Sequence, residues 1–234
     1  MTAQQVLDEI KPLGSESYKK VMLKHGVPEP FFGVKISELK EIQKRVKKNY
    51  QLAMDLYETG NYDAMYLAGL IADDARMTRK DLQRWADKAC MALAGHTVPS
   101  VAAGGKYGWE QGLEWIESKK EHVAVAGWGT LSGVVALRED ADLDLPALKK
   151  LLQRVQKTIH GAPNRVRYQM NGFVISVGCY VVPLQVLALE VGAKIGTVEV
   201  DMGDTACQVP EAVAYIKKVE ARGTLGKKRK TMKC

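Results

Sequence analysis

The feature that most constrains the fold of this chain is a succession of short amphipathic helical patterns, separated by loops that contain proline and glycine. The stretch from Ser37 to Tyr50 is an example, because Leu39, Ile42 and Val46 recur at the three- to four-residue spacing of one helix face. Strand-like alternation of apolar and polar residues is scarce. We therefore expect an all-α protein.

Residues that favour helix ends punctuate these patterns. Ser37 is expected to cap the helix that follows it. Thr78 and Asp81 form a variant of the capping box, and Asp144 is expected to cap a helix with proline in its first turn. Only residues 195–212 ("IGTVEVDMGDTACQVPEA") lack a helical pattern. The expected helices cover approximately residues 2–11, 15–25, 37–50, 52–59, 62–72, 78–95, 99–104, 107–117, 121–137, 144–161, 163–177, 182–194 and 210–222.

Several of these helices fall into pairs of about 35 to 45 residues, which is typical of a HEAT-like solenoid. In such a solenoid each helical pair buries one face against its neighbours. We predict one helical-repeat domain over residues 1–222, an α–α superhelix with a concave basic face, and a basic C-terminal tail over residues 223–234. Because no clean sequence repeat accompanies the spacing, a compact, non-repeating helical domain is the alternative.

Several classes of protein are disfavoured by the sequence. No window of about 18 apolar residues predicts a membrane span, and the N-terminus lacks the basic and apolar segments of a secretory signal. The four cysteines are widely spaced, which indicates free thiols in a reducing compartment. No His or Cys pair has zinc-ligand spacing, so we expect no metal and no cofactor. We expect an intracellular monomer.

The net charge of +7 is distributed unevenly. Residues 222–234 hold six basic residues and no acidic one, and without them 28 basic residues face 27 acidic ones. No acidic residue occurs over residues 145–189, although that segment holds six basic residues, and residues 31–50 hold six basic residues against two acidic ones. Clustered like charges cost stability unless an anionic partner offsets them, and nucleic-acid phosphate is the commonest such partner. A solvated surface is the alternative for each run taken alone.

The candidate DNA-contacting residues come mainly from these basic runs. Charge reversal at Arg154, Arg165 and Arg167 is predicted to weaken DNA binding regardless of DNA sequence, because phosphate contacts do not read bases. A nuclear location through "KKRK" is the expectation for a eukaryotic source, and association with the nucleoid for a bacterial one. The full set of candidates is Lys35, Arg45, Lys48, Arg84, His96, Lys149, Arg154, Arg165, Arg167, Lys227, Lys228, Arg229 and Lys230.

Two motifs carry a resemblance to a known family. Residues 31–48 ("FFGVKISELKEIQKRVKK") resemble a segment near the N-terminus of the AlkD-like DNA alkylation-repair proteins, and residues 55–89 resemble the helices that follow it. The resemblance covers residues 31–177 well and the remainder in outline. It implies HEAT-like repeats whose concave basic face wraps duplex DNA. For active members it also implies excision of positively charged alkylated purines without base flipping, unlike most glycosylases.

The catalytic residues of that family are not matched in this sequence. Active members carry a Trp and an Asp after the Arg-Trp helix, and the carboxylate stabilises the cationic sugar as the base leaves. The matching segment, residues 89–98 ("ACMALAGHTV"), has neither, and the carboxylate position falls near His96. An Arg and a second Trp of the family pattern are also missing, from residues 122–128 and 171–172. Since an imidazole cannot replace a carboxylate beside a cation, the sequence predicts binding of duplex, damaged or branched DNA without this chemistry.

Two other functions remain open. The chain is an active glycosylase if its catalytic groups have moved, and His96, Asp87 and Glu110 are then the candidates. It is a scaffold for another protein if it does not bind DNA. Steep salt dependence of binding separates the scaffold from the DNA binders, and release of alkylated base separates the two DNA binders from each other.

Overall fold

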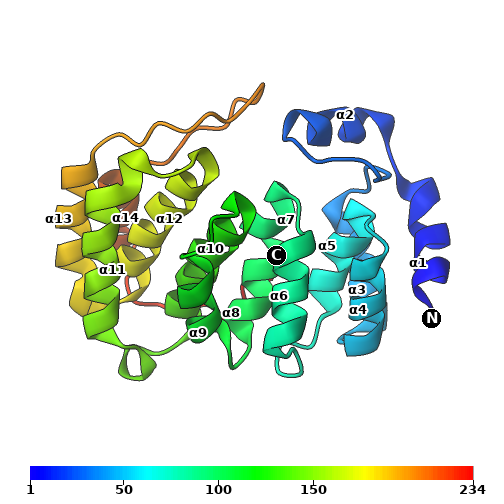
Figure 1. The fold of residues 1–234 in the computed structure, drawn as a ribbon, viewed down its shortest axis with the longest axis horizontal. Helices are drawn as coiled ribbons and strands as arrows, with labels where there is room; N and C mark the ends of the chain where they lie inside the picture. Colours follow the sequence, from blue (N-terminus) through cyan, green and yellow to red (C-terminus); the bar gives the residue numbers. More distant parts are fainter. Residues whose placement is uncertain (234) are drawn as a thin grey trace.

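The computed structural model describes residues 1–233, which form α-helices joined by short loops and 3-10 turns (Figure 1). Within this range no strand forms, and Gly14 and Val34 make one isolated antiparallel bridge. The all-α prediction is confirmed. In residues 1–233 no single helix is both long and apolar enough to cross a membrane, and residues 164–180 and 182–195 reach that length only together, across a bend of 117°.

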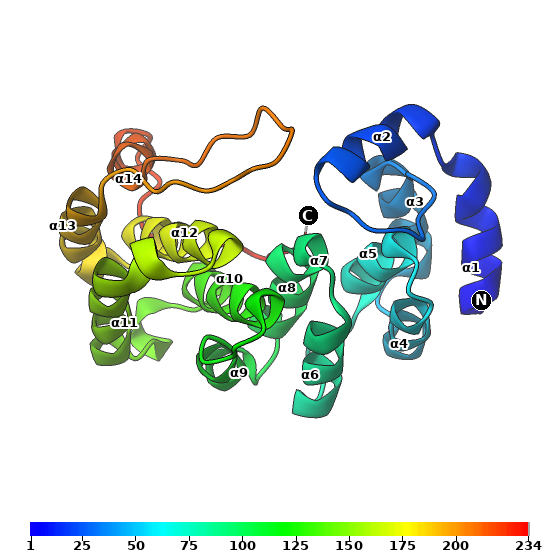
Figure 2. The ribbon, with the colours of Figure 1, turned by 45° about the horizontal axis from the view of Figure 1, so that its top comes forward.

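The helices pack in two rows, one above the other in Figure 2. In the second row, each helix packs against the next, from α3 to α14. This neighbour-to-neighbour stacking of helix pairs is the arrangement of a helical-repeat solenoid, as the sequence predicts. The first row comprises α4 (Tyr50–Glu58), α6 (Arg79–Lys88), α9 (Gly108–Trp115), α11 (Leu145–Thr158) and α13 (Gln185–Ile195). The second row comprises α3 (Ile36–Val46), α5 (Tyr62–Ile71), α8 (Thr97–Gly104), α10 (Glu121–Leu137), α12 (Asn164–Tyr180) and α14 (Ala212–Ala221).

Within residues 1–233, three further helices and a long loop lie outside the two rows. Residues 196–211 form the loop, which projects toward α2 in both views and which we call the arm (Figures 1 and 2). The arm is the stretch without a helical pattern, and that prediction is confirmed. The remaining helices are α1 (Ala3–Ile10), α2 (Glu16–Lys24) and α7 (Met91–Gly95).

Some predicted helix ends differ from those observed. Ser37 lies inside the first turn of α3, whose N-cap is Lys35, and Tyr50 begins α4 instead of ending α3. The helix expected over residues 78–95 is two helices, because Ala89 and Cys90 adopt extended backbone. The caps at Thr78 and Asp144 are confirmed, since each accepts a backbone N–H from the first turn of its helix.

Large aromatic residues pack between neighbouring helices of the first row, as Tyr57 of α4 and Trp85 of α6 show. Trp85 stacks on Tyr57 with ring centroids 4.0 Å apart, and the Tyr57 hydroxyl donates to the Trp85 carbonyl at 2.9 Å. Trp115 and Trp128 are each 1% exposed, so they belong to the core and present no ring to a ligand. Trp109 is partly buried against the same core. The stacked pair therefore joins α6 to α4 along the first row.

A buried carboxylate fastens the loop that precedes α3. Asp63 of α5 is 3% exposed and accepts the backbone N–H groups of Phe32, Gly33 and Val34 at 2.6, 3.1 and 3.2 Å. Burial raises the pKa of Asp63, and these three hydrogen bonds oppose the shift. One side chain thus positions the segment that leads into the basic helix α3.

Candidate nucleic-acid interface

The C-terminal residues of the chain pack along the second row. We call residues 224–233 the C-terminal strap. The backbone N–H of Gly226 donates to the carbonyl of Cys179, at the end of α12, at 2.8 Å. The backbone N–H of Arg229 donates to the carbonyl of Ala136, at the end of α10, also at 2.8 Å. The strap therefore joins the C-terminal ends of neighbouring helices, whose last carbonyls have no partner within their own helix.

Two strap lysines reinforce these contacts. The Lys228 ammonium donates to the carbonyls of Val135 and Tyr180 at 3.0 and 2.7 Å, and it pairs with Asp140 at 2.8 Å. The Lys233 ammonium donates to the carbonyl of Ala72 and pairs with Asp74, each at 2.6 Å. The Lys228 and Lys233 side chains are 9% and 10% exposed. Both ammonium groups therefore act inside the protein, where they also complement the negative ends of the helix dipoles.

A groove with a cavity volume of about 890 Å³ lies between the strap and the C-terminal ends of α3, α5, α8 and α10. Seven basic residues line it, against a single acidic one, Asp74. We call this cavity the basic groove. Its basic lining residues are Lys44, Lys47, Lys48, Arg138, Arg229, Lys230 and Lys233.

The basic residues of the groove differ in whether an acid already pairs with them. Lys233 pairs with Asp74, and Lys44 pairs with Glu41 at 2.6 Å on the surface of α3. Among residues 1–233 no ion pair is made by the other five, which remain available to an anion from outside the chain. These five are Lys47, Lys48, Arg138, Arg229 and Lys230.

The acidic residue of the groove is held by the strap. Burial raises the pKa of the Asp74 carboxyl, and the charge of Lys233 opposes that shift. Burial also lowers the pKa of Lys233, against the attraction of Asp74. Since the pair is close to neutral as a unit, it subtracts little from the positive potential of the groove.

Lys47 occupies a backbone conformation that normally requires glycine. It follows the last residue of α3 with φ 60° and ψ −148°, and within residues 1–233 it is the only residue other than glycine with positive φ. α13 ends with nearly the same geometry at Gly196, with φ 59° and ψ −142°. A side chain in this region costs about 1–3 kcal/mol. The strained position is thus occupied by a cation at the edge of the basic groove, where glycine would be the easier residue.

Three of the DNA-contacting candidates from the sequence line the basic groove. They are Lys48, Arg229 and Lys230, and all three are exposed. Lys35 is the N-cap of α3, and the length of the helix puts it about 15 Å from the C-terminal end that lines the groove. Lys149 is exposed on α11 in the first row.

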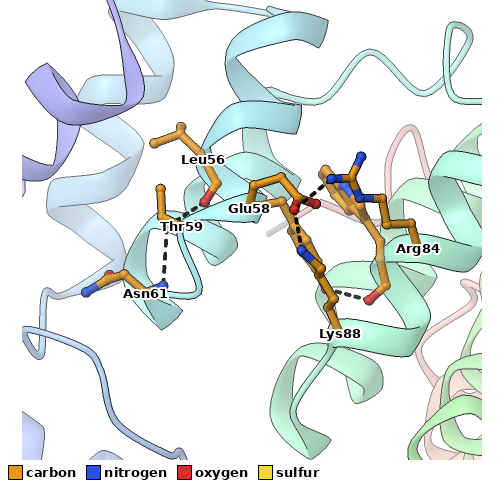
Figure 3. A network of polar contacts seen from close by, with 8 residues as sticks. Leu56, Glu58, Thr59, Asn61, Arg84 and Lys88 are labelled. Carbon is orange, nitrogen blue, oxygen red and sulfur yellow. Dashed lines mark hydrogen bonds and ion pairs between the residues drawn. The ribbon is translucent and has the colours of Figure 1, made fainter.

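Three other candidates are engaged in ion pairs between elements. Arg84 of α6 pairs with Glu58 of α4 at 2.7 Å, and Lys88 binds the same carboxylate (Figure 3). Burial alone would raise the pKa of Glu58, but these two cations lower it. Arg45 pairs with Glu9 of α1 at 2.6 Å, and Arg154 of α11 pairs with Glu117.

The arginines of α12 lie beside the arm. Arg165 donates from Nη1 to the sulfur of Met202 at 3.4 Å, and its backbone N–H donates to Glu121 at 2.8 Å. Arg167 donates to Asn164 at 3.5 Å, and it lines a separate cavity with the arm residues. Of the remaining strap candidates, Lys227 is exposed and Lys228 is the buried lysine described above.

The candidate catalytic residues lie on three different elements of the structure. His96, between α7 and α8, is exposed and lies beside the end of the strap, while neighbouring atoms lower its pKa by desolvation. The imidazole is therefore neutral near pH 7. Asp87 of α6 pairs with Lys120 at 2.8 Å, which lowers the pKa of its carboxyl. Glu110 is exposed on α9, so Asp87 and Glu110 both belong to the first row, away from the basic groove.

Several groove residues were not among the candidates. Lys44 and Lys47 lie in the basic helical stretch, but helical periodicity does not tell which cations face a neighbouring helix. Arg138 follows an apolar helix and has no sequence signal of its own. Asp74 belongs to an acidic loop, and Lys233 to the basic tail, and only the folded chain brings these two together.

Comparisons with known proteins agree with this architecture. Residues 6–178 match the family model described as DNA alkylation repair enzyme. The uncharacterised proteins Lin0241 of Listeria innocua and Lmo0209 of Listeria monocytogenes are each 32% identical over 228 residues, which cover 95% of this chain and 99% of theirs.

A solved structure is also similar over its whole length. It has a TM-score of 0.92 and 36% identity, with 100% of both chains covered, and it represents a new family of proteins related to the HEAT-like repeat DNA glycosylases with affinity for branched DNA structures. The HEAT-like fold predicted from the sequence is thus confirmed. With most of its length matched by the family model and by relatives above 30% identity, the chain belongs to the DNA alkylation repair enzyme family.

Proposed function

We propose that this chain binds DNA in the basic groove, without the base-excising chemistry of active glycosylases. The observation that carries the proposal is the composition of the groove lining, which holds seven basic residues and one acidic residue. DNA phosphates release counterions when such residues neutralise them, which drives binding without any base contact. The family and the branched-DNA affinity of the similar solved structure support DNA as the polyanion. A role on DNA implies an intracellular location.

The residues around the groove argue against glycosidic-bond cleavage. A departing cationic base leaves positive charge on the sugar, and a carboxylate must face that charge. Asp74 is the single acidic residue of the groove lining, and Lys233 already pairs with it. His96 stands near the position where active members carry their carboxylate, and its neutral imidazole does not stabilise a cation. Trp85, Trp115 and Trp128 are buried, so their rings do not reach a lesion.

The test combines binding and base release on the same DNA samples. Fluorescence anisotropy would measure affinity for a three-way junction and for a continuous duplex between 50 and 300 mM salt. Release of free base would be measured from methylated duplex. We expect log K to fall steeply with log salt, by about 0.9 for each phosphate contact, and base release at the spontaneous rate.

Two results would contradict the proposal. Base release above the spontaneous rate that disappears in Asp74→Asn, Asp87→Asn or Glu110→Gln would establish a relocated active site. Absence of salt-dependent DNA binding would instead favour the protein scaffold. Equal affinity for both DNAs would support DNA binding by the groove without a preference for branched DNA.

Lys47 offers a separate prediction, because one change should raise stability and lower affinity. Lys47→Gly is expected to increase the free energy of unfolding by about 1 kcal/mol, since glycine relieves the backbone strain and its greater chain entropy offsets part of the gain. The same change should weaken DNA binding severalfold and reduce the salt slope by about 1. Urea unfolding and anisotropy measure the two effects.

The matched control for this change is Lys48→Gly. It removes the same charge from the adjacent position, where the φ angle is not positive, so it should lower affinity without raising stability. A Lys47→Gly protein that binds DNA as tightly as the wild type would show that this side chain does not contact phosphate.

A further inference from the structure

A second cavity, of about 430 Å³, lies on the other side of the strap, between α12, α14 and the end of α10. We call it the strap-side pocket. Tyr180 of α12, Tyr215 of α14, and the strap residues Lys227 and Arg229 are part of its wall. Its volume is within the range of about 300–1,000 Å³ that is usual for sites that hold small ligands.

Tyr215 presents an aromatic ring to this pocket and to solvent. Tyr215 is 47% exposed and lines the pocket. Within residues 1–233, no other tyrosine is among the large exposed apolar side chains. A single exposed aromatic residue is common on protein surfaces and indicates little by itself. Lys227 and Arg229 of the strap share the same pocket wall, so the ring and two cations face one cavity.

Arg229 shares the wall of this pocket with both tyrosines, and its charge opposes the rise in the pKa of Tyr180. Burial raises the pKa of Tyr180, so the phenol stays protonated near neutral pH. Arg229 also lines the basic groove, as does Met232, so these two strap residues separate the two cavities.

The chemistry of the lining selects among ligands. The residues of the pocket wall include no Asp or Glu, whereas Lys227, Lys228 and Arg229 are basic, and only Lys228 is already paired with an acid. An acidic peptide would engage the cations but leave the aromatic ring unused. A nucleotide has both an anionic phosphate and a flat base, and aromatic rings beside cations are the usual means of holding unpaired bases.

We propose that the strap-side pocket takes an unpaired nucleotide where a DNA helix branches or is interrupted, with its base stacked on Tyr215 and its phosphate beside Lys227 and Arg229. The inference rests on the proposed DNA binding and adds a site that a continuous duplex does not fill, because its bases remain paired and stacked. The shared boundary at Arg229 places this pocket next to the basic groove. A duplex arm in the groove and an unpaired nucleotide in the pocket would then belong to one branched molecule.

The test uses the full chain and two DNAs of equal length and label. One is a three-way junction with two unpaired nucleotides at the branch, and the other is a continuous duplex. Tyr215→Ala is expected to raise the Kd for the junction about tenfold, the effect of losing one stacked base, and to change the Kd for the duplex less than twofold. Tyr215→Phe, which keeps the ring, should bind like the wild type.

The control variant is Val186→Ala, which removes an exposed apolar side chain from neighbouring α13, outside the pocket. It should leave both affinities unchanged. A 2-aminopurine at the unpaired position gives a second readout, because stacking on Tyr215 should quench its fluorescence in wild type and in Tyr215→Phe but not in Tyr215→Ala.

Each other outcome has a distinct meaning. If Tyr215→Ala weakens both DNAs equally, or weakens neither, the pocket does not take an unpaired base and the inference is wrong, while the basic groove stands. If the fluorescence of 2-aminopurine is quenched as strongly by Tyr215→Ala as by the wild type, the base stacks elsewhere and the inference is likewise wrong. If the wild type binds neither DNA, the proposed function itself fails, and this result is visible before any variant is made.

Discussion

Changing Lys48, Arg138 and Lys230 together to glutamine is expected to weaken DNA binding on the order of a hundredfold near 100 mM salt and to reduce the salt slope by about three. All three line the basic groove, and within residues 1–233 none of them makes an ion pair. Their charges are therefore available to phosphate. Because phosphate contacts carry no sequence information, the loss should be the same for DNAs of different sequence.

The comparison set is Arg154, Arg165 and Arg167, the three arginines that the sequence singles out on α11 and α12. Changing them to glutamine alters the net charge by the same amount. Arg154 is paired with Glu117, and Arg165 and Arg167 bond to groups near the arm, so we expect a smaller loss of affinity from this set. Anisotropy titrations at several salt concentrations measure both sets.

The comparison decides which surface holds the DNA. If the arginine set reduces affinity more than the groove set, the interface lies along α12 and the arm, and the basic groove is not the binding site. Thermal unfolding of both triple variants must accompany the titrations. Ion pairs on the surface contribute only about 0–1 kcal/mol each, so neither variant should unfold at the assay temperature.

The second large effect concerns stability. Asp63→Ala is expected to lower the free energy of unfolding by about 3–5 kcal/mol, because it leaves the N–H groups of residues 32–34 buried without an acceptor. Urea unfolding followed by circular dichroism measures the change. The segment released would be the loop before α3, so groove affinity should also fall as the helix loses its anchor.

The matched control is Asp55→Ala on α4. Asp55 is exposed and accepts one hydrogen bond, from Gln51 at 2.8 Å, so its loss should change stability by less than about 0.5 kcal/mol. If Asp63→Ala were as mild as Asp55→Ala, the three backbone N–H groups would have to find other acceptors, and the anchoring role of Asp63 would be wrong.

The pH dependence of stability gives an independent readout at the same residue. Burial raises the pKa of Asp63 in the folded protein above its unfolded value. Between these two values the folded state keeps a proton that the unfolded state releases, so the Asp63 contribution to stability falls as pH rises through that interval. Asp63→Asn should lack this contribution, and the difference between the two unfolding profiles should show it. Identical pH profiles for wild type and variant would contradict the shift.

The local structure of this protein follows from its sequence. Helix periodicity, the caps at Thr78 and Asp144, and the non-helical arm are short-range properties, since each depends on residues within a few positions of one another. The family resemblance likewise rests on contiguous motifs. The sequence also shows that the basic residues are clustered, because counting charges needs no fold.

Only the tertiary structure decides which of those charges a ligand can reach. Arg84 and Glu58 are far apart in the chain, and they meet because α4 and α6 pack as neighbours. Lys228 and Lys233 look like free tail residues in the sequence, yet the ends of the second-row helices bury them. Conversely, Arg138 becomes a groove residue through stacking of the repeats. A cation's partner is set by the elements packed against it, and that information is not carried by spacing along the chain.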